Sequence, residues 1–485
     1  MRLLLLFLLS PLFLYSQTQI GNDINGELTL DHFGYSVSSS SDGSVVAIGS
    51  PSNDDLQFGQ VRVFENNGNN WVQIGLAIKG EHPGDHFGRS VNLSSDGTIL
   101  AIGAPDNADT PEIAGHVRVY ENIGSSWVQI GDDIDGVAAT GGEGFPAQVR
   151  FGAHVSISDD GNTLAIAMPT GSTWEGGYGH DGYMHIYENI SGTWTQIGDA
   201  INTGISFLND ISLSGDGSVV AIFGDGDCGG GCWFGFQGFV KVYNNTSGVW
   251  TQIGETFSGT MNWDTFWMDS INSVSLNTHG SKLALGGRIS RVFENINNVW
   301  VQEGQDIEGE SYFNNYLISL SGDGTVFSLS NYLNSSNQYS TRIYKNNSGT
   351  WIQLGLDIAE GFGGIHGIST ELSGDGTTLV IGYPYFDGNA IDAGLARVYD
   401  LTAVLSIEES TLLNVKIFPN PTTTQFTIRL PESQSLEKVN MYNSLGQFIE
   451  TSDTQVIRTS HLTSGLYYVE VITSIGKAIK RIIIN

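Results

Sequence analysis

Charged residues are scarce in this chain of 485 residues, and basic residues are the scarcest. Asp, Glu, Lys and Arg together make up 15% of the sequence, and 51 acidic residues stand against 20 basic ones, which gives a formal net charge of −31 at pH 7. The low charged fraction argues against a disordered polyelectrolyte or a charged helical bundle. The negative sign repels phosphate backbones and anionic lipid headgroups, so we expect no nucleic-acid partner.

Long hydrophobic runs are missing after the first sixteen residues. The one apolar run, residues 3–15, follows a positively charged start and ends before the small residue Ser16. As a helix it would rise only about 20 Å against a hydrocarbon core of about 30 Å, and Pro11 interrupts it. We therefore predict a signal peptide over 1–16 in preference to a membrane anchor, and no membrane-spanning segment in the mature chain.

Cysteine is nearly absent, since Cys228 and Cys232 are the only two, in the segment C-G-G-G-C. In an oxidising space outside the cell such a pair favours a disulfide, because three glycines let the chain turn tightly enough for a bridge. A metal pair is the alternative, but no histidine or further cysteine stands nearby. We predict the disulfide, which should stabilise only modestly because it closes a small loop.

Catalytic signatures are also missing. The sequence holds no H-E-x-x-H, no G-x-S-x-G and no phosphate-binding P-loop. A glycan-cleaving enzyme would need two carboxyl groups facing each other across a groove, and four acidic residues in loops are candidates: Glu175, Asp181, Asp225 and Asp264. Acidic residues are common throughout the chain, so the presence of these four does not distinguish a glycan-cleaving enzyme from a protein without catalytic activity. We predict no catalytic residue, no cofactor and no metal ion.

Glycine is abundant, with 63 residues, and it belongs to a pattern that repeats seven times. A turn of the Asp-Gly type precedes each of seven apolar runs such as VVAIG, and the turns begin at Asp42, Asp96, Asp160, Asp216, His279, Asp323 and Asp375. A strand-like VRVF or VRVY sequence, or a variant of it, follows in each unit. A Trp that opens a WVQIG-like strand occurs six times: Trp71, Trp127, Trp194, Trp250, Trp300 and Trp351. Such repetition predicts an architecture of equal units.

The seventh copy of the WVQIG-like strand stands at the other end of the chain. Residues 18–27, TQIGNDINGE, match VQIGDDIDG at 128–136 and begin just after the predicted cleavage site. Each unit holds four short strands separated by Asn, Asp, Gly and Ser turns, for example 89–94, 98–103, 116–121 and 127–131. Seven units predict an all-β fold, a seven-bladed β-propeller over 17–403, in which the N-terminal strand completes the last blade beside 395–399.

Two repeated positions predict contacts between blades and not chemistry. The six Trp residues occupy one position each and are expected to pack between neighbouring blades. A basic residue in the middle of the third strand recurs in every unit except the third, which has His185: Arg62, Arg118, Lys241, Arg291, Arg342 and Arg397. We interpret this basic position as pairing between blades.

The variation in length falls in the loops of three consecutive units. In a four-stranded blade, the loops between strands two and three and the connections between blades lie on one face of the ring. Here they expand to 169–182, 224–237 and 255–269, and they carry aromatic residues: Trp174, Tyr178, Trp233, Phe234, Phe236, Trp263, Phe266 and Trp267. Exposed aromatic clusters mark binding sites for sugar faces or apolar side chains, so we predict a ligand-binding surface there. Packing of these aromatics under their own loops is the alternative.

Pairs of short motifs resemble the FG-GAP repeats of integrin-α-type propellers. Phe87-Gly88 precedes Gly103-Ala104-Pro105 in the second unit, and Phe33-Gly34 precedes Gly49-Ser50-Pro51 in the first. The resemblance implies a propeller over 17–403 that binds partners through its loop-bearing face. In that family a D-x-D-x-D-G loop binds calcium, whereas the corresponding loop here is S-x-D-G. One carboxylate for each turn is too few for calcium, so no metal is expected at these positions.

Residues 411–485 differ in charge from the rest, with 7 basic and 5 acidic residues, whereas residues 17–410 hold 12 and 46. We predict a linker at 404–410, followed by strand-length runs of alternating polarity that predict a small antiparallel β-sandwich. This segment closely resembles the C-terminal sorting domain of the type IX (Por) secretion system. The matching residues include Pro419, Asn420, Pro421, Gly446, Gly465, Tyr467, Lys480 and Arg481.

The resemblance implies an export route and its partners. In that family, which belongs to Bacteroidetes-type bacteria, the domain guides a protein through the type IX machinery across the outer membrane, and a sortase usually removes it. The protein is then released or linked to the cell surface. We therefore predict a secreted or surface-attached binding propeller, adhesin-like, with an extracellular glycan or protein as ligand. A glycan-cleaving enzyme and a structural surface element without a ligand are the alternatives.

Overall fold

The structure, a computed structural model of the chain, describes residues 17–51, 58–107, 115–136, 149–169, 182–205, 207–226, 237–262, 267–269, 271–309, 316–333, 338–360, 368–405, 415–430, 435–443, 448–473 and 476–485. The chain divides after Val404 into two compact units. Both units are built from antiparallel strands, and the described residues contain a single short helix, α1 (Thr402–Leu405). The predicted signal peptide and residues 406–410 of the predicted linker lie outside the described residues.

The N-terminal unit consists of seven antiparallel sheets, each with a path of four strands. In the first four sheets along the chain, a short fifth strand also pairs with the third strand. The first sheet has β3 (Ser36–Ser39), β4 (Val45–Ser50), β5 (Gln60–Asn66), β6 (Trp71–Gln73) and β7 (Ile78–Lys79). The second has β8 (Ser90–Leu93), β9 (Ile99–Ala104), β10 (His116–Ile123), β11 (Ser126–Gln129) and β12 (Ile134–Asp135). The third has β13 (His154–Ile157), β14 (Thr163–Met168), β15 (Tyr183–Ile190), β16 (Thr193–Gln196) and β17 (Ile201–Asn202).

The remaining sheets follow the same order of strands. The fourth has β18 (Phe207–Leu213), β19 (Val219–Gly226), β20 (Gln237–Thr246), β21 (Val249–Gln252) and β22 (Phe257–Ser258), and a separate hairpin of β23 (Thr260–Asn262) and β24 (Trp267–Asp269) comes next. The fifth has β25 (Ile271–Leu276), β26 (Lys282–Gly287), β27 (Ile289–Ile296) and β28 (Val299–Glu308). The sixth has β29 (Leu317–Leu320), β30 (Val326–Leu333), β31 (Gln338–Asn347) and β32 (Thr350–Glu360). The seventh has β33 (Ser369–Leu372), β34 (Thr378–Tyr383) and β35 (Leu395–Asp400), with β1 (Thr18–Gln19) and β2 (Ile24–Asn25).

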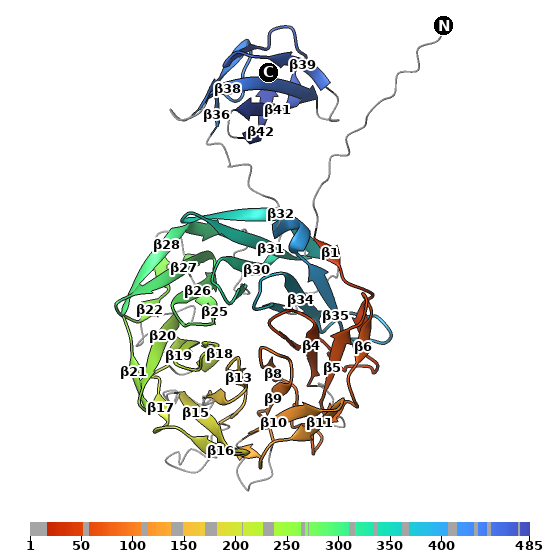
Figure 1. Ribbon diagram of the computed structural model, residues 1–485, viewed down its shortest axis with the longest axis vertical. Coiled ribbons are helices and arrows are strands. Elements are labelled where there is room, and N and C mark those ends of the chain that lie inside the picture. Colours follow the sequence, from red (N-terminus) through yellow and green to blue (C-terminus); the bar gives the residue numbers. More distant parts are fainter. Residues whose placement is uncertain are drawn as a thin grey trace. The chain divides into compact units, whose positions relative to one another are not determined.

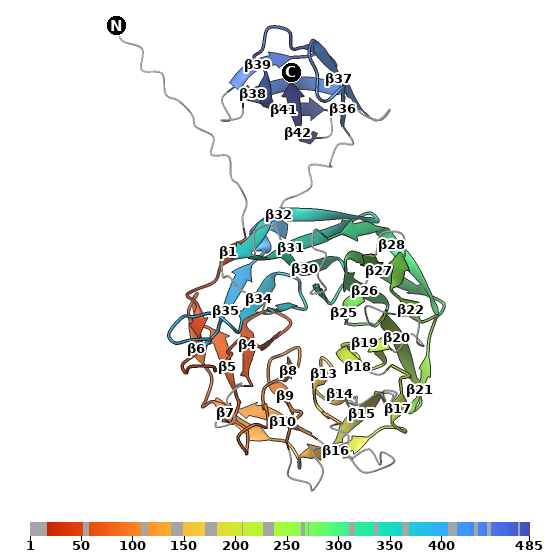
Figure 2. The same ribbon diagram turned by 180° about the vertical axis from the view of Figure 1, so that it is seen from behind.

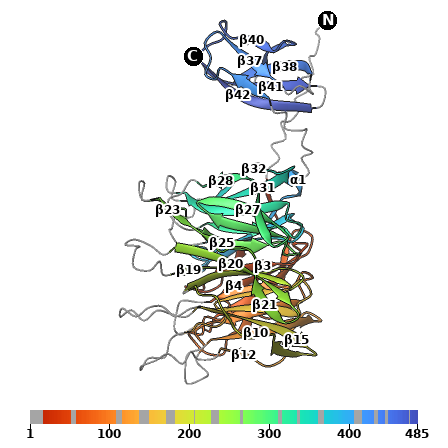
Figure 3. The ribbon, with the colours of Figure 1, turned by 90° about the vertical axis from the view of Figure 1, so that its left-hand side faces the viewer.

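The seven sheets are arranged around a ring (Figures 1 and 2), and in the edge view outer strands such as β21 and β28 face the viewer (Figure 3). The first strands of neighbouring sheets contact one another in chain order, and β33 of the seventh sheet contacts β3 of the first. Seven backbone hydrogen bonds between adjacent turns follow the same order. In the first of them, Ser41 N–H of the first sheet donates to Ser95 O of the second at 2.8 Å. In the last, Asp375 N–H of the seventh sheet donates to Ser41 O of the first at 2.8 Å, so the series returns to its starting residue.

The repeated S-x-D-G segment forms the turn between the first and second strands. In the second sheet, Asp96 Oδ1 accepts hydrogen bonds from Ser94 Oγ at 2.7 Å, from Thr98 N at 2.9 Å and from Thr98 Oγ1 at 2.7 Å. Gly97 has a φ of +69°, which a side chain would strain. Burial tends to raise the pKa of Asp96, but the hydrogen bonds from Thr98 and Ser94 outweigh it and hold this pKa below its usual range. The turn is thus held by its own hydrogen bonds.

The N-terminal segment joins the seventh sheet, as the repeat predicts. β1 and β2 both pair with β35, with Thr18 opposite Asp400 and Ile24 opposite Ala396. Between these two short strands, the Asp23 carboxylate accepts hydrogen bonds from Nε and Nη2 of Arg397 at 2.8 and 2.9 Å. The first and last strands of the unit therefore share one sheet.

Each repeated Trp packs between neighbouring sheets, which confirms the prediction for this position. Trp127, on the second sheet, packs against the core of the first, and its ring lies 3.5 Å from where a Cβ on Gly75 would stand. Trp71 Nε1 donates a hydrogen bond to Ile20 O at 2.9 Å, so the N-terminal segment also contacts the first sheet. A glycine stands opposite each ring, and at Gly254 and Gly304 a side chain would collide with the indole.

The repeated basic position is only partly explained by pairing between sheets. Arg62 donates to Asn25 O at 2.7 Å, and Lys241 donates to Thr203 O at 2.5 Å, and both contacts join different sheets. Three other arginines form ion pairs with an aspartate of their own sheet: Arg291 with Asp306, Arg342 with Asp357 and Arg397 with Asp23. The reason is that the outermost strand lies beside the third strand and places its aspartate within reach of the guanidinium.

The C-terminal unit has two antiparallel sheets. One has β36 (Lys416–Phe418), β37 (Gln425–Arg429) and β40 (Val456–Arg458), and the other has β39 (Phe448–Ser452), β38 (Leu436–Asn443), β41 (Gly465–Thr473) and β42 (Gly476–Ile484). Buried side chains from both sheets form one core that includes Phe426, Ile428, Val439, Val469 and Ile482. Within the described part of the whole chain, no helix is both long and apolar enough to cross a bilayer.

Candidate functional site: the axial cavity

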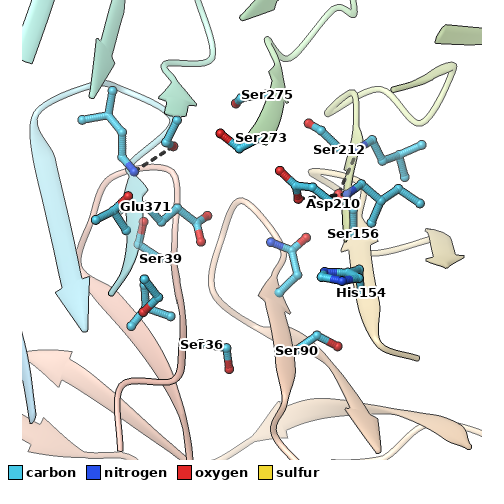
Figure 4. Close-up of a pocket in the computed structure, with 18 of the residues that line it drawn as sticks. Ser36, Ser39, Ser90, His154, Ser156, Asp210, Ser212, Ser273, Ser275 and Glu371 are labelled. Atoms are coloured by element: carbon cyan, nitrogen blue, oxygen red, sulfur yellow. Dashed lines mark hydrogen bonds between the residues drawn. The ribbon is translucent and has the colours of Figure 1, made fainter. Parts of the chain in front are cut away.

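A cavity of about 440 Å³ lies where the innermost strands of all seven sheets meet. We call it the axial cavity (Figure 4). At each level of the ring, every sheet contributes the residue that stands at the same position of its first strand. One level consists of Ser36, Ser90, His154, Asp210, Ser273, Leu317 and Ser369, and the next of Ser38, Asn92, Ser156, Ser212, Ser275, Ser319 and Glu371. The lining is therefore mostly polar and carries few charges.

The second of these levels holds neighbouring sheets together. Ser38 Oγ accepts a hydrogen bond from Leu93 N at 2.9 Å, and the corresponding serines accept from Leu213, Leu276, Leu320 and Leu372 at 2.9 to 3.0 Å. Asn92 accepts in the same way from Ile157 N at 2.7 Å. Glu371 completes the series, since its carboxyl group accepts hydrogen bonds from Ser38 Oγ and from the backbone of Ser39. One side-chain oxygen per sheet thus binds the next sheet.

Three acidic residues line this cavity, Asp159, Asp210 and Glu371, and the last two lie on opposite sides in Figure 4. Burial raises the pKa of Asp159, although a hydrogen bond from Thr278 opposes the shift. Asp210 accepts hydrogen bonds from Val274 N at 3.0 Å and from Ile211 N at 2.9 Å. Burial raises the pKa of Asp210 to about 7 and the pKa of Glu371 to about 8, although hydrogen bonds to each group oppose the shift. Both side chains keep some surface toward the cavity, where water screens part of this effect. Both groups therefore carry protons in part at neutral pH.

Arg89 and His154 supply the basic side of the cavity. The guanidinium of Arg89 lies over the ring of Tyr35, 5.2 Å from the centroid, and both residues line the cavity. Burial and the nearby charge of Arg89 lower the pKa of His154 to about 4, so the imidazole is neutral at pH 7. Arg89 is thus the one permanent cation among the residues that line this cavity.

A hydrogen-bonded ion cluster lies close to Arg89. His86 Nδ1 and Asp106 Oδ2 are 2.7 Å apart, and Arg150 Nε lies 3.5 Å from Asp106 Oδ1. Burial tends to raise the pKa of Asp106, but the hydrogen bond from His86 and the charges of Arg150 and Arg89 lower it below its usual range. The carboxylate of Asp106 is therefore already occupied by two other residues.

Several buried polar atoms at the border of the cavity lack a partner. They are Ser39 Oγ, Asn272 Oδ1 and Thr370 Oγ1, and none of the described residues bonds to them. Ser39 stands where the other six sheets have leucine or isoleucine, so a hydroxyl replaces an apolar side chain there. Buried polar atoms are nearly always hydrogen-bonded, so these three atoms can each accept or donate a further hydrogen bond.

The site residues predicted from the loops lie mostly outside the described residues. This applies to Trp174, Tyr178, Trp233, Phe234, Phe236, Trp263 and Phe266, to the predicted disulfide of Cys228 and Cys232, and to the acidic candidates Glu175, Asp181 and Asp264. Trp267 is in β24, opposite Asn262. Asp225 is in β19, where its carboxylate accepts a hydrogen bond from Asn209 Nδ2 at 2.8 Å. Burial raises the pKa of Asp225.

One cluster among the described residues has the donor types of a metal site: Glu81, His116 and Asp133. The guanidinium of Arg118 lies between the two acids and pairs with both of them. A cation there would have to displace Arg118, which carries a charge of the same sign. This donor set consequently suits an ion pair better than a metal ion.

Two acidic residues of the axial cavity can be recognised in the sequence by comparing the seven units. Aligning the seven units in register places Asp210 and Glu371 at positions where most units have serine. A charged residue at a repeated neutral position is the signal that could have identified them. The sequence prediction placed the site in the loops instead, because the loops are where the length and the aromatic content of the units differ most.

The sorting motif of the C-terminal unit has a clear structural role. Asn420 Nδ2 donates to Arg481 O at 2.9 Å, and Ile483 N donates to Asn420 Oδ1 at 2.9 Å. Thr422 N donates to Ile483 O at 2.8 Å, so the segment around Pro419 and Pro421 is bonded along the edge of β42. The motif therefore fixes the last strand of the domain.

The other matching residues occupy β41 and β42. Gly465 is the first residue of β41, and the hydroxyl of Tyr467, whose ring is in the core, donates to Thr463 O at 2.9 Å. Lys480 pairs with Val469, and Arg481 with Tyr468, in the register of the two strands. Gly446 lies outside the described residues.

Residues 416–485 match the family model described as a secretion system C-terminal sorting domain. The C-terminal unit is a sorting domain. The sorting domain supports export by the type IX system, contact with its machinery, and a secreted or surface location. No curated protein matches the chain. Among solved structures, a chain of Kuenenia stuttgartiensis hydrazine synthase is similar, with a TM-score of 0.43 and 11% identity, over 75% of this chain and 94% of that one.

The sorting domain provides a direct prediction. We expect Asn420→Ala to lower the stability of this domain by about 1–3 kcal/mol, because two backbone groups of β42 lose their partner. Export should fall with it, measured as the fraction of the protein found outside the cell or on its surface. Gln425→Ala, a change of an exposed side chain, is the control. Unchanged export of the Asn420 variant would show that fixing β42 is unnecessary for sorting.

Proposed function

We propose that residues 17–403 form a seven-bladed β-propeller of the integrin-α type, exported with the help of a signal peptide and the sorting domain, and that it binds an extracellular glycan or protein. The seven sheets, their order around the ring and the hydrogen bonds that return from Asp375 to Ser41 support the propeller. The sorting domain supports the destination. The ring then acts as a binding module, adhesin-like, and not as an enzyme.

The axial cavity is the observation that carries the binding function. Its volume is within the range of about 300–1,000 Å³ that is usual for ligand pockets. Its lining offers hydroxyl, amide and carboxyl groups, together with buried polar atoms that need a partner. These are the groups that recognise the hydroxyls of a sugar or the polar end of a peptide. A ligand that enters the cavity would contact several sheets at once.

A glycan and matrix-protein array tests this proposal with the full chain and two variants. In His154→Leu/Ser36→Leu, two polar side chains of the first level become leucine, the residue that Leu317 already provides at this level. We expect binding to fall about tenfold or more, since the polar groups that recognise the ligand are lost. In Trp233→Ala/Trp263→Ala/Trp267→Ala, the predicted loop aromatics are removed instead.

The two variants separate the two predicted binding surfaces. Loss of binding in the cavity variant alone supports the axial cavity, and loss in the loop variant alone moves the site to the aromatic loops while the binding function stands. Both variants must melt at the temperature of the unchanged chain. An unchanged chain that binds nothing on the array contradicts the proposal and favours a structural surface element.

Glycan hydrolysis is the second candidate, because two carboxyl groups with raised pKa values line one cavity. Acid and base roles in glycosidases need two carboxyl groups in different protonation states. Against this role, both groups already accept backbone hydrogen bonds that link sheets. Release of new reducing ends from a bound glycan would favour this candidate over binding alone.

A further inference from the structure

We propose that the axial cavity takes a small ligand that carries a carboxylate, such as an acidic sugar, and that Arg89 binds this carboxylate. The inference deepens the proposed function and rests on it, because it requires the cavity to be the binding site. It concerns the class of the ligand. The argument starts from the distribution of charge in the cavity.

Arg89 is an unusual cation in this unit. Residues 17–410 contain only 12 basic residues, and six of them occupy the repeated mid-strand position. Arg89 stands outside that position and lines the cavity. Its guanidinium contacts the face of Tyr35, and it forms no ion pair with any residue that the structure describes. No described residue accepts a hydrogen bond from this half-buried guanidinium in the contacts that the structure shows, so its donors suit a ligand.

No acidic group among the described residues forms an ion pair with Arg89, although its charge acts on Asp106 through space. Asp106 is bonded to His86 and lies 3.5 Å from Arg150, so its two oxygens have other partners. Asp210 and Glu371 bond to the backbone of neighbouring sheets, and their raised pKa values mean that both hold protons in part at neutral pH. The guanidinium of Arg89 is therefore the group of this cavity that can bind an anion.

The remaining groups suit the rest of such a ligand. The neutral imidazole of His154 and the hydroxyls of Ser36 and Ser90 stand at the first level of the cavity (Figure 4). Each hydroxyl donates its hydrogen to a backbone oxygen of the next sheet at 2.8 Å, so it can serve a ligand as an acceptor. Partly protonated carboxyl groups can donate as well as accept hydrogen bonds, as sugar hydroxyls require. A guanidinium binds a carboxylate through two parallel hydrogen bonds, which gives both affinity and orientation. Uronic acids combine these features in one molecule.

Isothermal titration calorimetry of the full chain at pH 7 tests this inference, with D-glucuronate as the probe and D-glucose as the neutral comparison. We expect D-glucuronate to bind and D-glucose to bind more weakly. Arg89→Gln should weaken D-glucuronate binding about tenfold or more, and Arg89→Lys less, because the charge remains but the paired geometry is lost. Arg288→Gln, a half-buried arginine that does not line the cavity, is the matched control and should bind normally.

The outcomes distinguish this inference from the proposed function. Equal D-glucuronate affinity of the Arg89→Gln and unchanged chains overturns the role of Arg89. If D-glucuronate does not bind, while a neutral array ligand binds and is lost in His154→Leu/Ser36→Leu, the carboxylate class is wrong and the cavity function stands. If nothing binds to the unchanged chain in either experiment, both are overturned. Melting temperatures of the variants exclude misfolding as the cause of a loss.

Discussion

A chain that lacks residues 17–26 should melt at least about 10 °C below the chain that begins at Gln17. The deletion removes both short strands that pair with β35, and it removes the buried side chain of Ile24 from the core. It also leaves Arg397 without Asp23 and Trp71 Nε1 without Ile20 O. Each of these losses costs about 1–5 kcal/mol, which together is a large part of the stability of a typical domain.

The measurement is thermal unfolding of the two chains, followed by circular dichroism. A chain without residues 406–485 is the control, because the sorting domain is a separate compact unit. We expect its main transition to stay near that of the full chain. A deletion of 17–26 that leaves the melting temperature unchanged would mean that the N-terminal strands are not needed to close the seventh sheet.

The stability of the N-terminal unit should fall as the pH rises from about 5 to about 8.5, owing to Asp210 and Glu371. In the unfolded chain both carboxyl groups lose their protons near pH 4, whereas in the folded chain burial raises their pKa values to about 7 and about 8. Between these values the folded state binds more protons than the unfolded state, so stability decreases with rising pH. We expect the pair to account for a loss of about 2 kcal/mol, after allowance for water in the cavity.

Denaturant unfolding of Asp210→Asn/Glu371→Gln across the same pH range checks this expectation. The double variant cannot ionise, so its stability should change less between pH 5 and pH 8.5 than that of the unchanged chain. Asp210→Asn keeps only one of the two oxygens that accept backbone hydrogen bonds, so the comparison uses the slope of stability against pH. Asp132→Asn, a change of an exposed carboxyl group, is the control and should follow the unchanged chain. A double variant whose stability falls with pH as steeply as that of the unchanged chain would show that these two carboxyl groups do not cause the pH dependence.

The strands and turns of the N-terminal unit could be read from the repeat because their causes are local. The second unit illustrates this, since the strands predicted at 89–94, 98–103, 116–121 and 127–131 are observed as β8, β9, β10 and β11 within a few residues. An aspartate followed by glycine bonds to its own turn, whatever the rest of the chain does. The pairing of 18–27 with the last strand was also predicted, because the repeat was one strand short.

The partners of the arginines could not be predicted in the same way. Arg291 and Asp306 are fifteen residues apart, and their contact depends on how β27 and β28 pair, including a register shift between Ser290 and Val292. The sequence suggested a partner in the next blade because the position repeats. Only the pairing of the strands showed that an aspartate of the same sheet is also a partner.

The sequence by itself determined the all-β class, the repeated four-strand units and the sorting domain, because these follow from patterns within short segments. The tertiary structure decided where the candidate site lies. Arg89, Asp210 and Glu371 are far apart in the chain, and their side chains line one cavity only because seven first strands converge on the axis of the ring. Burial at that axis also sets the charge states of Asp210 and Glu371, since a pKa depends on the surroundings that the whole fold provides.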